Sequence, residues 1–169
     1  MSRAAFVSPA TRLVAVSEKD TKRASALIEG ASMAKPFACV PPEATLARVV
    51  AEGIPVNAGS IDMLRQLGAR APGHRVWLRI NPGFGHGHSQ KTNTGGEHSK
   101  HGIWHEDLHD ALRRADRHGL GVTGLHLHIG SGTDIEHLAQ VCGASERLAR
   151  EIGRTLTTIS AGGGLPTPY

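Results

Sequence analysis

Apolar residues recur along this chain with two different spacings. In segments such as His74–Ile80, every second residue is apolar, which is typical of a strand with one buried face. In segments such as Glu106–His118 and Asp134–Ile152, apolar residues lie three or four apart, which is typical of an amphipathic helix. The two kinds of segment alternate from Phe37 onward. This alternation predicts parallel strands joined by helical crossovers.

Glycines and prolines between these segments set the predicted boundaries. The strands are predicted at residues 54–58, 74–80, 124–129 and 155–160. The helices are predicted at residues 41–53, 60–68, 106–118 and 134–152. Residues 84–101 are glycine-rich and without period, and they predict a long loop of a kind that is usually functional or disordered. One apolar stripe is expected along the last helix, formed by Ile135, Leu138, Val141, Cys142, Leu148 and Ile152.

These elements predict an α/β fold, a partial (β/α)8 barrel with about four βα units. The chain has 169 residues, fewer than the ~200–250 that such a barrel usually needs. Residues 1–36 carry no periodic signal and are expected to form a divergent or disordered segment. Residues 37–169 are expected to form one barrel-derived domain.

Composition narrows the classes of function. The formal charge is +4, and no run of Lys and Arg is interleaved with aromatic residues, which argues against nucleic-acid binding. No apolar run approaches the ~20 residues of a membrane span. Cys39 and Cys142 lie far apart and form no metal or redox motif, as is common in cytoplasmic proteins.

The stretch Gly124–Gly132 has the strongest chemical pattern. His126 and His128 share one face of the predicted strand, opposite its apolar residues. The following Gly130-Ser131-Gly132 offers free backbone N–H groups and a hydroxyl, a combination that suits an anion. Arg79 and the triple glycine 162–164 also fall at carboxyl ends of predicted strands, the end that carries the chemistry in parallel barrels.

Six motifs occur in a fixed order. They are Val56-Asn57-Ala58-Gly59-Ser60, Leu78-Arg79-Ile80-Asn81-Pro82, Thr94-Gly95-Gly96, Ser99-Lys100-His101-Gly102-Ile103, His126-Leu127-His128-Ile129-Gly130-Ser131-Gly132 and Gly162-Gly163-Gly164. Together they resemble the pyridoxal-phosphate-dependent diaminopimelate decarboxylases, which belong to the alanine-racemase-like barrel group. The resemblance covers about residues 37–169.

The resemblance implies pyridoxal 5'-phosphate as cofactor and a small amino-acid substrate, meso-diaminopimelate, which the family converts to lysine and CO2. By the same resemblance, His128 stacks on the pyridine ring and Arg79 lies near the phenolic oxygen. Ser131 and the glycines 162–164 bind the phosphate. The family also forms homodimers.

The sequence departs from the family in one important respect. The lysine that holds the cofactor as an imine has no clear counterpart, and Lys35 is a poor candidate because Pro36 would disturb a strand there. No catalytic residue is therefore assigned. We expect an internal piece of the enzyme that is catalytically incomplete and prone to aggregation.

Two other interpretations remain open. One is an inactive remnant that binds phosphate compounds only. The other is a metal-dependent hydrolase barrel, in which His126 and His128 form a zinc pair and His86, His88 or His98 add ligands.

Overall fold

The computed structural model describes residues 12–13, 43–85, 94–97, 99–130 and 135–163. The helices are α2 (Glu43–Ala51), α3 (Ile61–Arg70), α4 (Leu108–Arg117) and α5 (Ile135–Ile152), with a 3-10 turn η1 (His105–Asp107). The strands are β1 (Arg12–Leu13), β2 (Val56–Ala58), β3 (Arg75–Asn81), β4 (Ile103–Trp104), β5 (Gly121–His126) and β6 (Thr158–Ser160).

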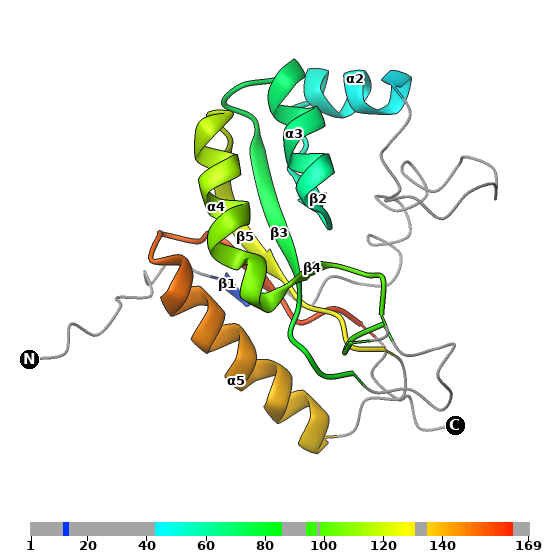
Figure 1. Ribbon diagram of the computed structural model, residues 1–169, viewed down its shortest axis with the longest axis vertical. Helices are drawn as coiled ribbons and strands as arrows, with labels where there is room; N and C mark the ends of the chain where they lie inside the picture. Colours follow the sequence, from blue (N-terminus) through cyan, green and yellow to red (C-terminus); the bar gives the residue numbers. More distant parts are fainter. Residues whose placement is uncertain (1–11, 14–42, 86–93, 98, 131–134, 164–169) are drawn as a thin grey trace, which may run out of the picture.

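The strands form one parallel sheet in the order β1-β6-β5-β3-β2, with β4 paired to the end of β3. The strands β2, β3, β5 and β6 are neighbours in the same order as in the chain. Each successive strand therefore adds to the same edge, as in a (β/α)8 barrel and unlike a doubly wound sheet. Figure 1 shows α4 lying over β3 and β5, with α5 packed beside α4. The predicted partial barrel with about four βα units is confirmed.

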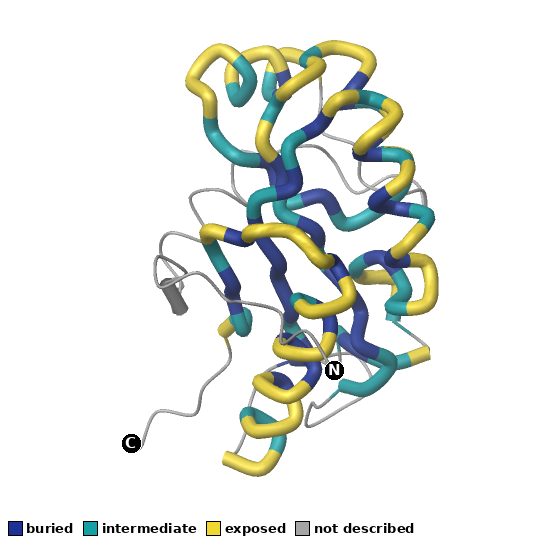
Figure 2. Tube along the Cα trace, turned by 90° about the vertical axis from the view of Figure 1, so that its left-hand side faces the viewer, coloured by how far each residue is buried: buried dark blue, intermediate teal, exposed yellow. Residues whose placement is uncertain are grey.

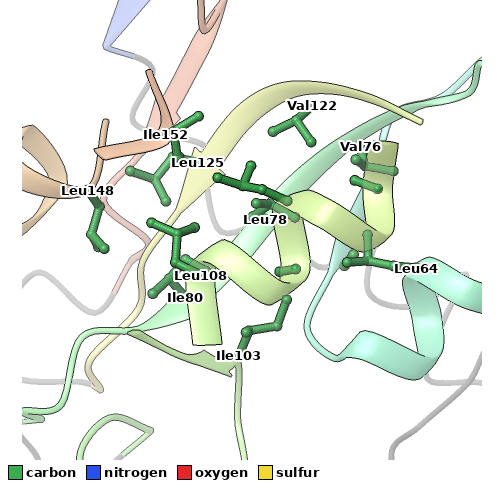
Figure 3. Packing of buried hydrophobic residues seen from close by; sticks show 14 of the residues in the cluster. Leu64, Val76, Leu78, Ile80, Ile103, Leu108, Val122, Leu125, Leu148 and Ile152 are labelled. Atoms are coloured by element: carbon green, nitrogen blue, oxygen red, sulfur yellow. The ribbon is translucent and has the colours of Figure 1, made fainter. Parts of the chain in front are cut away.

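The helices cover one face of the sheet. On β3, Val76, Leu78 and Ile80 are at most 1% exposed, whereas Trp77 and Arg79 are half-buried on the opposite face. The buried face packs against leucines of the helices, and Figure 3 shows Leu64, Leu108, Leu148 and Ile152 around these strands. In Figure 2 the buried positions follow the strands, while the exposed positions lie on the outer turns of the helices. The predicted alternation is confirmed, and the second face is left for polar side chains.

The predicted end of α3 at Gly68 is wrong. The helix continues through Gly68 to Arg70. Gly68 does not end the helix; it leaves space for a neighbouring helix. A Cβ at Gly68 would lie 2.2 Å from the Cβ of His118, which follows α4. The glycine thus allows the ends of α3 and α4 to approach closely.

Other boundaries differ by a few residues. β5 begins at Gly121 and ends at His126, although Leu127 and Ile129 continue the buried alternation. α4 begins only at Leu108, because the 3-10 turn η1 precedes it. The strands β2 and β6 are each shorter than predicted at their amino ends.

The stripe predicted along α5 is correct only in part. Val141, Leu148 and Ile152 are buried, but Ile135 is 87% exposed and Cys142 is exposed too. The first turn of α5 lies at the lower end of the molecule, away from the sheet (Figure 1). Helical spacing indicates which residues share a face, but it does not say how far the covering sheet extends.

Two short strands were not predicted. β1 lies in the segment without periodic signal and pairs with β6, Arg12 opposite Thr158. β4 follows Gly102, whose φ is +85° and where a Cβ would lie 2.9 Å from the backbone N of Asn81. Two residues are too few to show a period.

Within the described residues, no helix has the length and apolarity required to cross a membrane.

Candidate functional site

Three polar residues stand in one row across the sheet. Arg79 of β3 is in register with His126 of β5, which is in register with Ser160 of β6. Residues in register on adjacent strands point to the same face. Since Leu78 and Leu125 face the helices, this row lies on the opposite face, at the carboxyl ends of the strands.

His126, in the middle of the row, is buried, at 9% exposure. Its Nδ1 is hydrogen-bonded to Oγ of Ser160 at 3.0 Å, and Ser160 is itself 1% exposed. Burial, with the charges of Arg79 and His128, lowers the pKa of His126 from 6.5 to about 3. The imidazole is therefore neutral at physiological pH and joins β5 to β6 within the sheet.

His128 follows β5 and is half-buried. Its Nδ1 lies 3.2 Å from the backbone N of Gly163, which donates the hydrogen bond. Its ring stacks near that of His126, with centroids 6.5 Å apart and planes at 21°. Burial, Arg79 and His101 lower its pKa, so this imidazole also favours the neutral form.

The turn after β6 needs a glycine at position 162. Its φ is +80°, where only glycine is free of strain, and its N–H donates to Oγ of Ser160 at 3.3 Å. A Cβ there would lie 2.6 Å from both Nδ1 of His128 and the carbonyl oxygen of Leu127. At Gly163, by contrast, a Cβ would have no atom of the described residues within 4 Å. Among the described residues, the turn is therefore close-packed at Gly162 and not at Gly163.

Asn81, at the end of β3, ties a second loop to the site. Its Oδ1 accepts from the N–H groups of Gly83 and Gly96, and its Nδ2 donates to the carbonyl of Gly96 at 2.9 Å. Oγ1 of Thr94 then donates to the carbonyl of His128 at 3.2 Å. The Thr94-Gly95-Gly96 motif is thereby held between the ends of β3 and β5.

The β2 side of the site carries two further features. Gly59 lies beside Arg79, and a Cβ on it would be 3.8 Å from Cδ of the arginine. Asn57, in register with Trp77, has a buried Oδ1 with no hydrogen-bond partner among the described residues. A buried acceptor without a partner is costly, so this oxygen is a candidate to accept a hydrogen bond from a ligand.

The structure brings together the predicted residues Arg79, His128, Gly162 and Gly163. Ser131 and Gly164 lie outside the described residues, and so do Lys35, His86, His88 and His98. Sequence reasoning missed the contributions of Ser160 and Asn81. A polar residue at the last position of an apolar strand, directly before a glycine-rich turn or loop, was the available signal for both.

Metal ligation finds no support in the described part of the chain. No group of three or more His, Cys, Asp or Glu side chains lies close enough there to hold a metal ion. His126 and His128 each engage Nδ1 in a hydrogen bond within the protein. The zinc pair His126 and His128 would therefore need its further ligands, His86, His88 or His98, from outside the described residues.

Residues 13–169 match the sequence profile described as pyridoxal-dependent decarboxylase, pyridoxal binding domain. The diaminopimelate decarboxylase of Escherichia coli is 66% identical over 127 residues, which cover 75% of this chain and 30% of that protein. That of Streptomyces coelicolor is 66% identical over 125 residues, covering 74% of this chain and 28% of its own length. The chain thus spans less than a third of the length of these curated relatives.

Solved structures give the same picture. A crystal structure of a diaminopimelate decarboxylase superposes with a TM-score of 0.72 at 65% identity, covering 78% of this chain and 31% of the other. The lysine decarboxylase of Selenomonas ruminantium shares the fold, with a TM-score of 0.62 at 23% identity over 76% of this chain and 34% of its own. The extent of the profile match and the shared fold show that this chain belongs to the pyridoxal-dependent decarboxylases, through their pyridoxal-binding domain.

Proposed function

We propose that this chain is part of a diaminopimelate decarboxylase and binds pyridoxal 5'-phosphate at the carboxyl ends of β3, β5 and β6. The observation that carries the proposal is that Arg79, His128 and the Gly162–Gly163 turn lie together at the carboxyl ends of the strands. The 66% identity to diaminopimelate decarboxylases supports the specific substrate, meso-diaminopimelate, and the products lysine and CO2.

The residues present fit the chemical groups of the cofactor. The N–H groups of Gly162 and Gly163 donate to Ser160 and His128 within the protein. A phosphate beside this turn would therefore take its hydrogen bonds from the backbone N–H of Gly164 and the hydroxyl of Ser131, as the family resemblance implies. The neutral, flat imidazole of His128 suits stacking on a pyridine ring. Arg79 supplies a permanent positive charge for the phenolic oxygen.

When bound, pyridoxal phosphate supplies an electron sink for the carbanion left by decarboxylation. The protein's part is to bind and orient it. We assign no residue of this chain to the imine bond, and we propose that the chain alone binds the cofactor weakly without decarboxylating. We also propose that it acts in the cytoplasm and shares the homodimeric assembly that the family resemblance implies.

Titration calorimetry with pyridoxamine 5'-phosphate tests the binding, since this compound lacks the aldehyde that would react with surface lysines. Pyridoxamine, which lacks the phosphate, should bind more weakly. Ser131→Ala should lose one hydrogen bond to a charged group, about 1.5–3 kcal/mol of binding free energy. His128→Ala should weaken binding through lost stacking, about 0.5–1.5 kcal/mol.

Ser145→Ala is the matched control for these variants. Its hydroxyl is buried and donates to the carbonyl of Val141 within α5, away from the site, so binding should be unchanged. Equal affinities for wild type, Ser131→Ala and His128→Ala would refute the site.

The catalytic part of the proposal has its own assay. Incubation with diaminopimelate and pyridoxal phosphate should release no lysine above a blank containing cofactor alone. Release above that blank, or a borohydride-trapped adduct on Lys35, would show that this chain supplies the imine lysine after all.

A further inference from the structure

The turn after β6 and the end of β5 are joined by a continuous set of hydrogen bonds. The N–H of Leu127 donates to the carbonyl of Ser160 at 2.9 Å, continuing the sheet past His126. Oγ of Ser160 contacts His126 Nδ1 and accepts from Gly162 N–H. The N–H of Gly163 then donates to Nδ1 of His128. The ring of His128 is thus hydrogen-bonded to the backbone of the turn after β6, 35 residues away in sequence.

This attachment determines where the proton of His128 resides. A backbone N–H can only donate, so Nδ1 of His128 must be an acceptor and carries no hydrogen. Burial and the nearby charge of Arg79 favour the neutral ring. A neutral imidazole has one proton, which must then be on Nε2.

We propose that Ser160 and the Gly163 N–H are positioning groups for His128, holding its ring in the Nε2–H tautomer beside the glycine turn. The ring thereby presents a π face for stacking and an N–H donor at its far edge. The tautomer is a property of the protein alone. Its consequence for pyridoxal phosphate rests on the proposed function.

Ser160 acts through the geometry of the turn. Its hydroxyl accepts the N–H of Gly162, the residue whose φ of +80° directs the next N–H toward His128. Without that hydroxyl, Gly162 N–H and His126 Nδ1 both lose this partner at a position where Ser160 is 1% exposed. We expect the turn to shift and the Gly163 N–H to leave Nδ1 of His128.

Long-range 1H–15N NMR of the histidine side chains at neutral pH shows which ring nitrogen carries the proton. The signals of His128 are identified as those that are missing from the spectrum of His128→Gln. The expected result is an unprotonated Nδ1 and a protonated Nε2. Solid-state NMR of sedimented protein gives the same nitrogen shifts if the chain associates. A protonated Nδ1, or a ring protonated on both nitrogens, would overturn the proposal.

Two substitutions at position 163 distinguish the effect of losing the backbone N–H from the effect of replacing the glycine. Gly163→Ala keeps the N–H and has open space for its methyl group, so His128 should keep the Nε2–H tautomer. Gly163→Pro removes the N–H, and Nδ1 should then show partial protonation. If both variants leave the spectrum of His128 unchanged, the N–H does not set the tautomer.

Ser160→Ala should likewise mix the two tautomers of His128, whereas Ser145→Ala should not. Both substitutions remove one buried hydroxyl, so a general loss of stability would affect both spectra. Binding of pyridoxamine phosphate gives a second measurement, and Ser160→Ala should weaken it several-fold. A shifted tautomer with unchanged binding would uphold the positioning role and count against the proposed cofactor site. An unchanged tautomer in Ser160→Ala would remove Ser160 from the proposal.

Discussion

His126 is a neutral histidine in the row of polar residues across the sheet, in register with Arg79. The folded protein resists protonating this ring, because burial and the charge of Arg79 lower its pKa to about 3. The unfolded chain protonates the same ring near pH 6.5. Between these two values the unfolded state binds more protons than the folded state, so acid favours unfolding.

We therefore predict that stability is fully present above about pH 6.5 and falls as the pH decreases toward 3. This one ring should contribute about 1.4 kcal/mol of lost stability for each pH unit. Urea unfolding at several pH values measures the slope. In His126→Asn the slope should be shallower. Equal slopes for His126→Asn and wild type would show that His126 is not held neutral.

Individual residues were predictable where their chemistry is local. Gly162 belongs to an obvious glycine cluster, and His128 stands on the polar face of an alternating strand. Ser160 and Asn81 were not predictable in the same way, because their partners are distant in sequence. Ser160 contacts His126, 34 residues away, and Asn81 binds Gly96, 15 residues away across a loop. Only the sheet register brings such pairs together.

The elements were predicted best where the apolar period is long. α5, with 18 residues, was located almost to its ends, whereas the two-residue strands β1 and β4 show no period at all. Gly68 misled the prediction for α3, because a glycine can either end a helix or admit a neighbour. The sequence alone does not distinguish these two uses.

At the element scale we predict a large difference between two apolar residues of α5. Leu148 is 2% exposed against the sheet, so Leu148→Ala should cost about 2–5 kcal/mol of unfolding free energy. Ile135, at 87% exposure, lies on the same helix, and Ile135→Ala should change stability by less than about 0.5 kcal/mol. Chemical denaturation measures both. Similar costs would mean that α5 packs with a different face toward the sheet.

The sheet as a whole is open, with β2 at one described edge and β1 at the other. Edge strands present N–H and C=O groups that can pair with another chain. On the face away from the helices, Trp77 rests on Gly124, where a Cβ would be 2.4 Å from its ring, and it remains half-buried. Leaving about 100 Å2 of such apolar surface exposed costs about 2.5 kcal/mol, against a total stability of ~5–15 kcal/mol for a domain.

We therefore predict that the purified chain self-associates or is loosely packed. Light scattering should detect dimers or larger species at micromolar concentration, and hydrogen exchange should be faster in β2 than in the central strand β3. A monomer that melts sharply, with equally protected amides in all strands, would instead identify this part of a barrel as a self-sufficient domain.

A pyridoxal phosphate site at the carboxyl ends of β3, β5 and β6 is tested most directly by mapping amide chemical-shift changes on addition of pyridoxamine 5'-phosphate. The largest changes should cluster at Arg79, His128 and Gly163, and pyridoxamine without phosphate should spare Gly163. Changes confined to the outer helical surface, or to the amino ends of the strands, would contradict it.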